Sequence, residues 1–464
     1  MSKTGRRTGN PTRLASVSAF VPYSWLVLGI GIFAAISYGY GDQILDRLAS
    51  LDDAHTAPVL AAFSLFALCG FVSCYATLGT PLPSFVVAIA FGIAGHRLFA
   101  PIVGNSTVLA SLVTGSAAVI LFGGGLEMPL RDFGRLFFKI ALLAFPGVLL
   151  TGFAFSLVAG GIASTSGLPI GLPVVIVLGA ILASTDPAAI IPVLQNVRFR
   201  RRDTKDIVVA ESALNDVVGT LLTSVFLKLP LVGLTIVAAY ESLATSATFH
   251  FLMEQVGFGA LFGLLGFCLL WFLNHNKRRY PPHYGADQFY FLAVPLMSFA
   301  AAVAFGGSGF LAAFLAGLLF HGEEHMEGIE RFFAQVIDGA AKPIIFLLVG
   351  ALVDVHALIA FAPVGIAVGL IFMFVIRPAM VFLVLGAYGF LRKEQGGLSV
   401  QELFFISFVR ETGAIPAVLL VTAVAQMAPP VSGLIEVGMW VILLTLVIAP
   451  PLTPYVARKL GVAD

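Results

Sequence analysis

Residues 206–222, DIVVAESALNDVVGTLL, carry acids and an amide within an otherwise apolar run. On a helix, Glu211 and Asn215 are four residues apart and share one stripe, while Ser212 and Asp216 share a neighbouring stripe. Glu211 and Asp216 are five apart and therefore point well away from each other. One acid could meet a structural partner, and the other, with a hydroxyl one turn above it, could meet a ligand. Hydroxyl, carboxylate and carbonyl oxygens are hard ligands that suit an alkali cation.

The preceding apolar run, AILASTDPAAIIP (residues 180–192), contains Asp186 and Pro187. Pro187 has no N–H and clashes with the turn before it, which frees the carbonyl of Ala183. Non-helical backbone at membrane depth is tolerated where it lines a cavity or is buried in protein. A carboxylate at such a break can neutralise the positive end of a half-helix. The sequence therefore predicts an interrupted helix with a charge at its break.

A second break is predicted in FVRETGAIPAV (residues 408–418), where Gly413 and Pro416 interrupt a run that bears Arg410 and Glu411. The first broken run is predicted to pass outward-to-inward and the second inward-to-outward. Two interrupted helices of opposite direction, one in each half of a chain, indicate an inverted-repeat transporter.

The elements that must position these residues are membrane helices. The chain has 464 residues, of which 59% are hydrophobic and only 11% charged, too few charges to cover a soluble protein of this length. The net charge of +1 gives no strong field for nucleic acid. The three cysteines lie in apolar runs and suggest neither a disulfide framework nor a zinc site. We therefore expect an all-α polytopic membrane protein with no cofactor and no resident metal.

Apolar runs of 18 or more residues, each long enough to cross a ~30 Å hydrocarbon core, recur along the chain, and fourteen candidate spans are predicted in all. The segment 229–250 is predicted to be an interfacial excursion. The predicted spans are residues 18–40, 57–79, 82–99, 106–127, 139–161, 172–195, 206–228, 251–274, 287–305, 308–320, 342–360, 363–391, 402–420 and 433–456.

The distribution of Lys and Arg orients these spans. With the N-terminus inside, the inner segments hold twenty-one Lys or Arg residues, and the outer segments hold only Arg47, Arg97 and Lys228. This positive-inside bias predicts that both termini are cytoplasmic.

Six ionisable residues lie deep in predicted spans, where each costs roughly 2.5–3.5 kcal/mol on insertion scales. Four of them are acids and two are arginines, so at least one carboxylate remains to exchange a proton or bind a cation. The six are Asp186, Glu211, Asp216, Arg377, Arg410 and Glu411.

STDPAA followed by ESALNDVVG resembles the NhaP/NHE branch of the cation:proton antiporters. In FVIRPAMVFL (residues 374–383), the resemblance makes Arg377 the partner of Glu211. GSGFLAAFLAGLLF (residues 307–320) and VRETGAIP resemble further spans of that family. The resemblance places Thr185, Asp186 and Pro187 at the crossing of the broken helices, and Ser212, Asn215 and Asp216 at the ion site.

The implied activity is exchange of a monovalent cation, Na⁺ first with K⁺ or Li⁺ as alternatives, for H⁺ by alternating access, serving pH homeostasis in the cell membrane. Exchange is expected to be electroneutral, because Asn215 is a neutral amide where the electrogenic branch has a second aspartate. The expected organisation is an N-terminal segment with an additional span (1–56), an antiporter domain (57–456) and a cytoplasmic tail (457–464). Within the domain, a core (139–228 and 363–456) would rock against a scaffold (57–127 and 251–360) that forms a homodimer.

The sequence departs from the family pattern at two acids. Many relatives have Glu in an LFEGG-like stretch, whereas LFGGGLE (residues 121–127) has Gly123 there and Glu127 four residues on. Glu411 replaces the usual glycine and would either pair with Arg410 or act in transport.

Other functions remain alternatives at this stage. A cation channel could use Asp216 in a polar filter. Asp186 and Asp216 could suggest an intramembrane aspartyl protease, and HGEEH (residues 321–325) matches a zinc-protease pattern without an obvious third ligand.

Overall fold

The computed structural model describes residues 23–50, 56–77, 83–128, 130–185, 194, 197–279, 285–322, 326–392, 398–427 and 431–463. In these ranges the only strand-like pairing is an isolated antiparallel bridge between Phe199 and Ala463. Ten helices are long and apolar enough to cross a membrane, and four shorter apolar helices accompany them. The chain is therefore an all-helical, multi-pass membrane protein, as its composition predicted.

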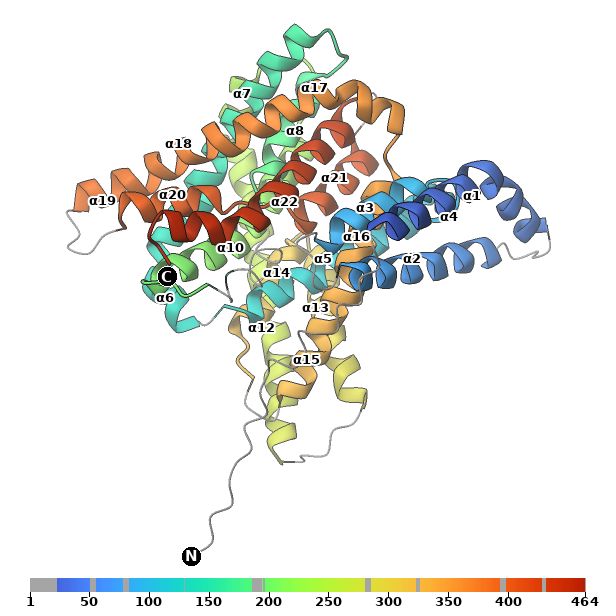
Figure 1. The fold of residues 1–464 in the computed structure, drawn as a ribbon. Helices are drawn as coiled ribbons and strands as arrows, with labels where there is room; N and C mark the ends of the chain where they lie inside the picture. The colour runs from blue at the N-terminus through green and yellow to red at the C-terminus, as the bar shows by residue number, and fades with distance from the viewer. Residues whose placement is uncertain are drawn as a thin grey trace, which may run out of the picture.

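Helices from two separate parts of the chain form a first lobe, in which α16 packs against α3, and α14 packs against α5, α12 and α13. Figure 1 shows α1 to α4 in blue at one side of the molecule, next to α16. The elements of this lobe are α1 (Tyr23–Ser50), α2 (Thr56–Ala76), α3 (Ser84–Ala94), α4 (Ala100–Val103), α5 (Ser106–Leu126), α12 (Ser246–Arg279), α13 (Gly285–Ala304), α14 (Gly309–Leu319), α15 (Glu327–Val336), the π-turn η6 (Ile337–Ala341) and α16 (Lys342–Ala351).

The second lobe is also built from two parts of the chain, with α10 packed against α6 and α8, and α22 packed against α17 and α21. Its N-terminal elements are α6 (Leu130–Leu142), η2 (Leu143–Gly147), α7 (Val148–Ser166), α8 (Leu172–Leu182), α10 (Arg202–Lys228), α11 (Ile236–Glu241) and the short η4 (Ser242–Ala244). Its C-terminal elements are α17 (Val355–Ile371), η7 (Phe372–Ile376), α18 (Arg377–Val381), η8 (Phe382–Gly386), α19 (Ala387–Arg392), α20 (Val400–Phe408), α21 (Ala414–Gln426) and α22 (Leu434–Lys459).

Glycines let helices of the first lobe touch backbone to backbone. A Cβ on Gly350 of α16 would lie 2.3 Å from the carbonyl oxygen of Ile89 in α3, and one on Gly317 of α14 would lie 2.1 Å from that of Phe122 in α5. No side chain fits at these distances, so small residues allow the close packing that membrane helices use in place of a hydrophobic driving force.

Three of the π-turns lie next to prolines. Pro146 is inside η2, while Pro343 and Pro378 stand two residues after the ends of η6 and η7. Proline removes a backbone donor and its ring crowds the preceding turn, and a widened turn accommodates both effects without ending the helix. The turn η7 directly precedes Arg377, so it sets the direction in which that side chain leaves its helix.

Both predicted interruptions coincide with helix ends. Helix α8 ends at Leu182 and is followed by non-helical residues 183–185, while Asp186 and Pro187 lie outside the described residues. In the second interruption, α20 ends at Phe408 and α21 begins at Ala414, leaving residues 409–413 non-helical.

One predicted boundary is wrong. The predicted spans 342–360 and 363–391 meet at residues 361–362, but α16 ends at Ala351 and α17 runs from Val355 through Pro363. The helix begins where Asp354 accepts a hydrogen bond from the N–H of Ala357 at 2.8 Å. An N-capping carboxylate thus overrides the proline as a boundary signal, since a membrane helix can accommodate an internal proline.

Two further segments differ from the prediction in the extent of their helices. The first helix reaches Ser50, beyond the predicted end at residue 40. The predicted excursion 229–250 contains the short helix α11.

The C-terminal residues pair with the loop that leads into α10. The N–H of Arg200 donates to the carbonyl of Val462 at 3.0 Å, next to the Phe199–Ala463 bridge. Val462 and Ala463 are buried by this contact. Figure 1 accordingly shows the C-terminus beside α6 and α10.

Candidate functional site

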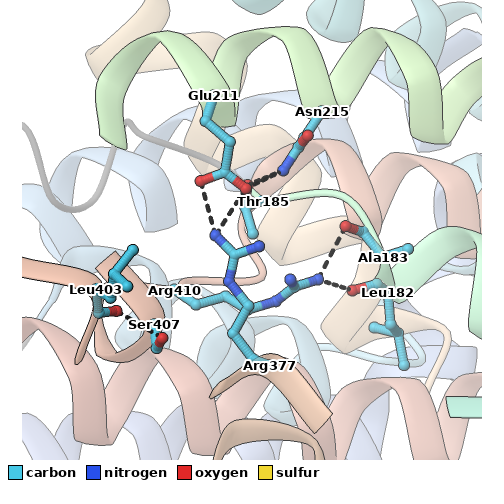
Figure 2. Close-up of polar contacts among 9 residues, drawn as sticks. All are labelled: Leu182, Ala183, Thr185, Glu211, Asn215, Arg377, Leu403, Ser407 and Arg410. Atoms are coloured by element: carbon cyan, nitrogen blue, oxygen red, sulfur yellow. Dashed lines mark hydrogen bonds and ion pairs between the residues drawn. The ribbon is translucent and has the colours of Figure 1, made fainter. Parts of the chain in front are cut away.

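A buried ion pair joins α10 to α18. The guanidinium Nη2 of Arg377 donates to both carboxylate oxygens of Glu211 at 2.7 Å, as Figure 2 shows. Both residues are about 1% exposed. The structure thus brings together the two residues that the resemblance placed opposite each other, and Arg377 neutralises one of the two buried acids of α10.

The amide of Asn215 connects this pair to the first interruption. Its Nδ2 donates to Oε1 of Glu211 at 2.5 Å and to Oγ1 of Thr185 at 3.3 Å (Figure 2). Glu211 and Asn215 are one turn apart on α10, as the four-residue spacing requires. Because both amide hydrogens bind neighbouring side chains, Asn215 holds α10 against the break that follows α8.

Arg410 spans the two interruptions. It lies in the non-helical segment before α21, and its Nη2 donates to the carbonyls of Leu182 and Ala183 at 2.8 Å each (Figure 2). Its guanidinium carbon also lies 4.5 Å from the ring centroid of Phe372, within cation–π range. The positive charge therefore meets the negative end of α8, where the last carbonyls have no helical partner.

Asp216 lies on α10 at the inner end of a cleft. It is 2% exposed, and Ser212, one turn before it, is also buried. The cleft has a cavity volume of about 30 Å³, room for roughly two waters or one small ion. It is lined by Ile120, Leu121, Gly123, Gly124, Glu127, Ala213, Asp216, Phe314, Ile337 and Lys342.

The second interruption contains further buried polar groups. Glu411 is 2% exposed, and Thr412 is completely buried. The hydroxyls of Thr412 and Thr445 are 2.7 Å apart, and the N–H of Thr412 donates to Oγ1 of Thr445 at 3.2 Å. These bonds fix the non-helical backbone against α22.

Two predicted features fall partly or wholly outside the described residues. One is Asp186, predicted at the crossing. The other is the HGEEH stretch, of which the structure describes only His321 and Gly322.

Sequence reasoning missed a polar junction at the starts of α10 and α20. Glu402 accepts from Oγ1 of Thr204 at 2.8 Å and from Arg201 at 3.4 Å, and it forms a capping box with Ser399. The signal was present, because Ser399 and Glu402 match the S-x-x-E pattern of a helix start. The interrupted helix α20 is thereby fixed to the helix that carries Asp216.

Taken together, the site holds one buried acid of α10 in an ion pair beside the first interruption. It places the other on a small cleft between α10, α5, α14 and the η6–α16 segment. A carboxylate in such a place can hold a proton or a dehydrated cation, while fixed dipoles surround it.

Comparisons with known proteins match this arrangement. The family model described as sodium/hydrogen exchanger, transmembrane, matches residues 59–459. The chain is 31% identical to a K⁺/H⁺ antiporter NhaP of Alkalimonas amylolytica, over 73% of this chain and 55% of that protein. It is 27% identical to a K⁺/H⁺ antiporter NhaP2 of Shewanella baltica, over 79% of this chain and 60% of that protein. The chain thus spans little more than half the length of these curated relatives.

An archaeal relative is matched both in sequence and in structure. The chain is 27% identical to Na⁺/H⁺ antiporter 1 of Methanocaldococcus jannaschii, over 65% of this chain and 68% of that protein. The solved structure of the sodium proton antiporter MjNhaP1 from that organism superposes with a TM-score of 0.63, at 21% identity, covering 87% of this chain and 99% of the other. The fold is therefore that of this antiporter.

Proposed function

Because this chain belongs to the sodium/hydrogen exchanger family, we propose that it is a secondary transporter that exchanges a monovalent alkali cation for protons. The family is one of transporters rather than of catalytic enzymes. Relatives named as K⁺/H⁺ and as Na⁺/H⁺ antiporters support the class of cargo, with Na⁺, K⁺ and Li⁺ as the candidate cations.

The observation that carries this proposal is the different placement of the two buried acids on α10. Glu211 is engaged by Arg377, whereas Asp216 lines a cleft of about 30 Å³. Of the two, Asp216 is therefore the acid placed to exchange its proton for a cation from solution. Ser212, with a hydroxyl one turn away, is proposed to complete the site with backbone oxygens near Thr185 and Asp186.

Exchange follows from competition for one carboxylate. Asp216 must be deprotonated to bind a cation, so each cation that binds displaces a proton. One carboxylate holds either one proton or one cation, so we expect one-for-one, electroneutral exchange. Arg410 and Asn215 are proposed as positioning residues that hold the interrupted helices around the site.

Alternating access requires one part of the protein to move against another. We expect the core (139–228 and 363–456) to rock against the scaffold (57–127 and 251–360), with the boundary shifted to the break between α16 and α17. A homodimer through the scaffold, cytoplasmic termini and placement in the cell membrane are expected from the family resemblance and the positive-inside bias.

The test is proton movement in proteoliposomes that contain a pH-sensitive dye, after addition of Na⁺, K⁺ or Li⁺. Wild-type protein should move protons in response to at least one cation, and Asp216→Asn, which keeps the shape of the side chain, should abolish the response. Glu254→Gln, at an exposed acid on α12, is the matched control and should exchange normally. Wild-type-like exchange by folded Asp216→Asn would exclude the mechanism, and a cation current that needs no counter-ion would identify a channel instead.

A further inference from the structure

The cleft that leads to Asp216 contains two other charged side chains, which the proposed exchange does not yet use. Glu127 and Lys342 line it together with Asp216, and the remaining lining is apolar side chains and glycine. Asp216 is almost fully buried, whereas Glu127 is exposed. The cleft therefore runs from an exposed acid at its mouth to a buried acid at its inner end.

Glu127 stands where an acid is unfavourable for the helix that carries it. It caps the C-terminus of the 21-residue helix α5, and its N–H donates to the carbonyl of Gly123 at 3.1 Å. The C-terminal end of a helix carries a partial negative charge and favours basic side chains. The helix dipole thus does not favour a glutamate at this position.

Lys342 brings a positive charge to the same cleft. Its ammonium lies 2.6 Å from Oδ1 of Asp338, one turn earlier across the π-turn η6, and its side chain is only 19% exposed. A cation that enters the cleft toward Asp216 therefore meets a positive as well as a negative side chain. Asp338 and Glu127 are the acids that offset this ammonium.

We infer that Glu127 attracts the transported cation to the mouth of the cleft. Lys342, whose ammonium is held by Asp338, repels the cation and so limits this attraction. The inference rests on the proposed function. A carboxylate at the mouth of a low-dielectric cleft raises the local concentration of cations, by up to about tenfold, and the Lys342 ammonium in the same cleft opposes that rise. Glu127 would thus act on cation capture and leave the exchange step at Asp216 unchanged.

The experiment measures initial exchange rates in proteoliposomes across a range of cation concentrations at low ionic strength. Glu127→Gln should raise the apparent KM for the cation about three- to tenfold while the maximal rate is retained. Lys342→Met, which keeps the aliphatic stem, should lower the apparent KM. The matched control is Glu327→Gln, at an exposed acid that begins α15 and does not line the cleft, and its KM should be that of the wild type.

Two further readouts separate recruitment from a structural contribution. The KM effect of Glu127→Gln should shrink when choline chloride raises the ionic strength, because the Debye length falls from about 30 Å at 0.01 M to about 8 Å at 0.15 M. The melting temperature of this variant measures any structural contribution of Glu127 separately, and the KM effect should remain under conditions in which variant and wild type are both fully folded.

The outcomes also separate this inference from the proposed function. No exchange by the wild-type protein with any alkali cation would remove the proposed function itself. Normal wild-type exchange with an unchanged KM in Glu127→Gln, or with a lower maximal rate at an unchanged KM, would overturn the recruitment inference and leave the antiporter proposal standing.

Discussion

The guanidinium of Arg410 donates a 2.8 Å hydrogen bond to the main-chain carbonyl of Ala183, so one side chain ties the break after α20 to the break after α8. Ala183 directly follows the last residue of α8, Leu182, and Pro187, four residues further on in the sequence, has no N–H to offer its carbonyl. A group orphaned by one interrupted helix is thus satisfied by a cation from the other.

Replacement of Arg410 should therefore destabilise the protein. Arg410→Gln is expected to lower the free energy of unfolding by several kcal/mol, since two buried carbonyls lose a charged donor at about 1–3 kcal/mol each. Arg410→Lys keeps the charge but loses the planar contact with Phe372, so its loss should be intermediate. Thermal unfolding in detergent measures both variants. Arg97→Gln, at an exposed ion pair with Asp42, is the control. Equal stability of Arg410→Gln and the wild type would contradict a stabilising contact between Arg410 and the carbonyls at the end of α8.

The Glu211–Arg377 pair should behave as a coupled unit. Either single alanine variant leaves an uncompensated buried charge and is expected to cost ~3–5 kcal/mol, whereas the double variant should recover part of the loss. The same cycle on the exposed pair Arg97–Asp42 should give a coupling of only about 0–1 kcal/mol. Additive losses at Glu211 and Arg377 would show that the contact contributes no coupling.

Asn215→Asp should make stability depend on pH. A protonated aspartic acid at position 215 can donate a hydrogen bond to Oε1 of Glu211, as the amide does. An ionised one cannot donate, and its negative charge repels the Glu211 carboxylate. The melting temperature of this variant should therefore fall further below that of the wild type at pH 8 than at pH 5. Asn215→Ala loses the donor at every pH, so its melting temperature should lie below that of the wild type by the same amount at pH 5 and pH 8. A difference that is equally constant for Asn215→Asp would contradict the hydrogen bond from residue 215 to Glu211.

Exchange should be insensitive to membrane potential and should weaken in acid. With one exchanging carboxylate no net charge crosses, and protons compete with the cation, so the apparent cation affinity should fall as the pH falls. Rates measured at several clamped potentials test the first point, and KM measured across pH tests the second. A rate that follows the potential would show that a further group, such as Glu411 or Asp186, titrates during the cycle.

The fold could be predicted where the local sequence signal agrees with the membrane environment. Apolar run length located most of the helices, and Gly413 and Pro416 marked the second interruption. The predicted boundary between residues 360 and 363 was wrong, because the run is apolar on both sides of it and the capping carboxylate of Asp354 decides where α17 begins. The π-turns were not predicted, because a single inserted residue barely changes the apolar pattern.

The site could be predicted only as far as spacing along one helix determines contacts. The four-residue spacing of Glu211 and Asn215 anticipated their shared stripe, and the hydrogen bond from Asn215 to Glu211 lies along it. No periodicity indicates that Arg410 reaches carbonyls more than two hundred residues away, nor that Phe372 lies beneath its guanidinium. Such contacts depend on how the two halves of the chain pack.

The bridge between Phe199 and Ala463 attaches the residues that follow α22 to the loop before α10, so that these two segments move together. Anything joined to the chain at that point, whether a fluorescent protein, a dye or a further folded unit, inherits the position and motion of the lobe that holds Asp216. Energy transfer between a dye attached there and a second dye on the opposite lobe would therefore report the distance between the lobes in single molecules, without a label near the ion site. A fusion at this end also needs a spacer, because a bulky partner attached without one would disrupt the backbone pairing of residues 199–200 with residues 462–463.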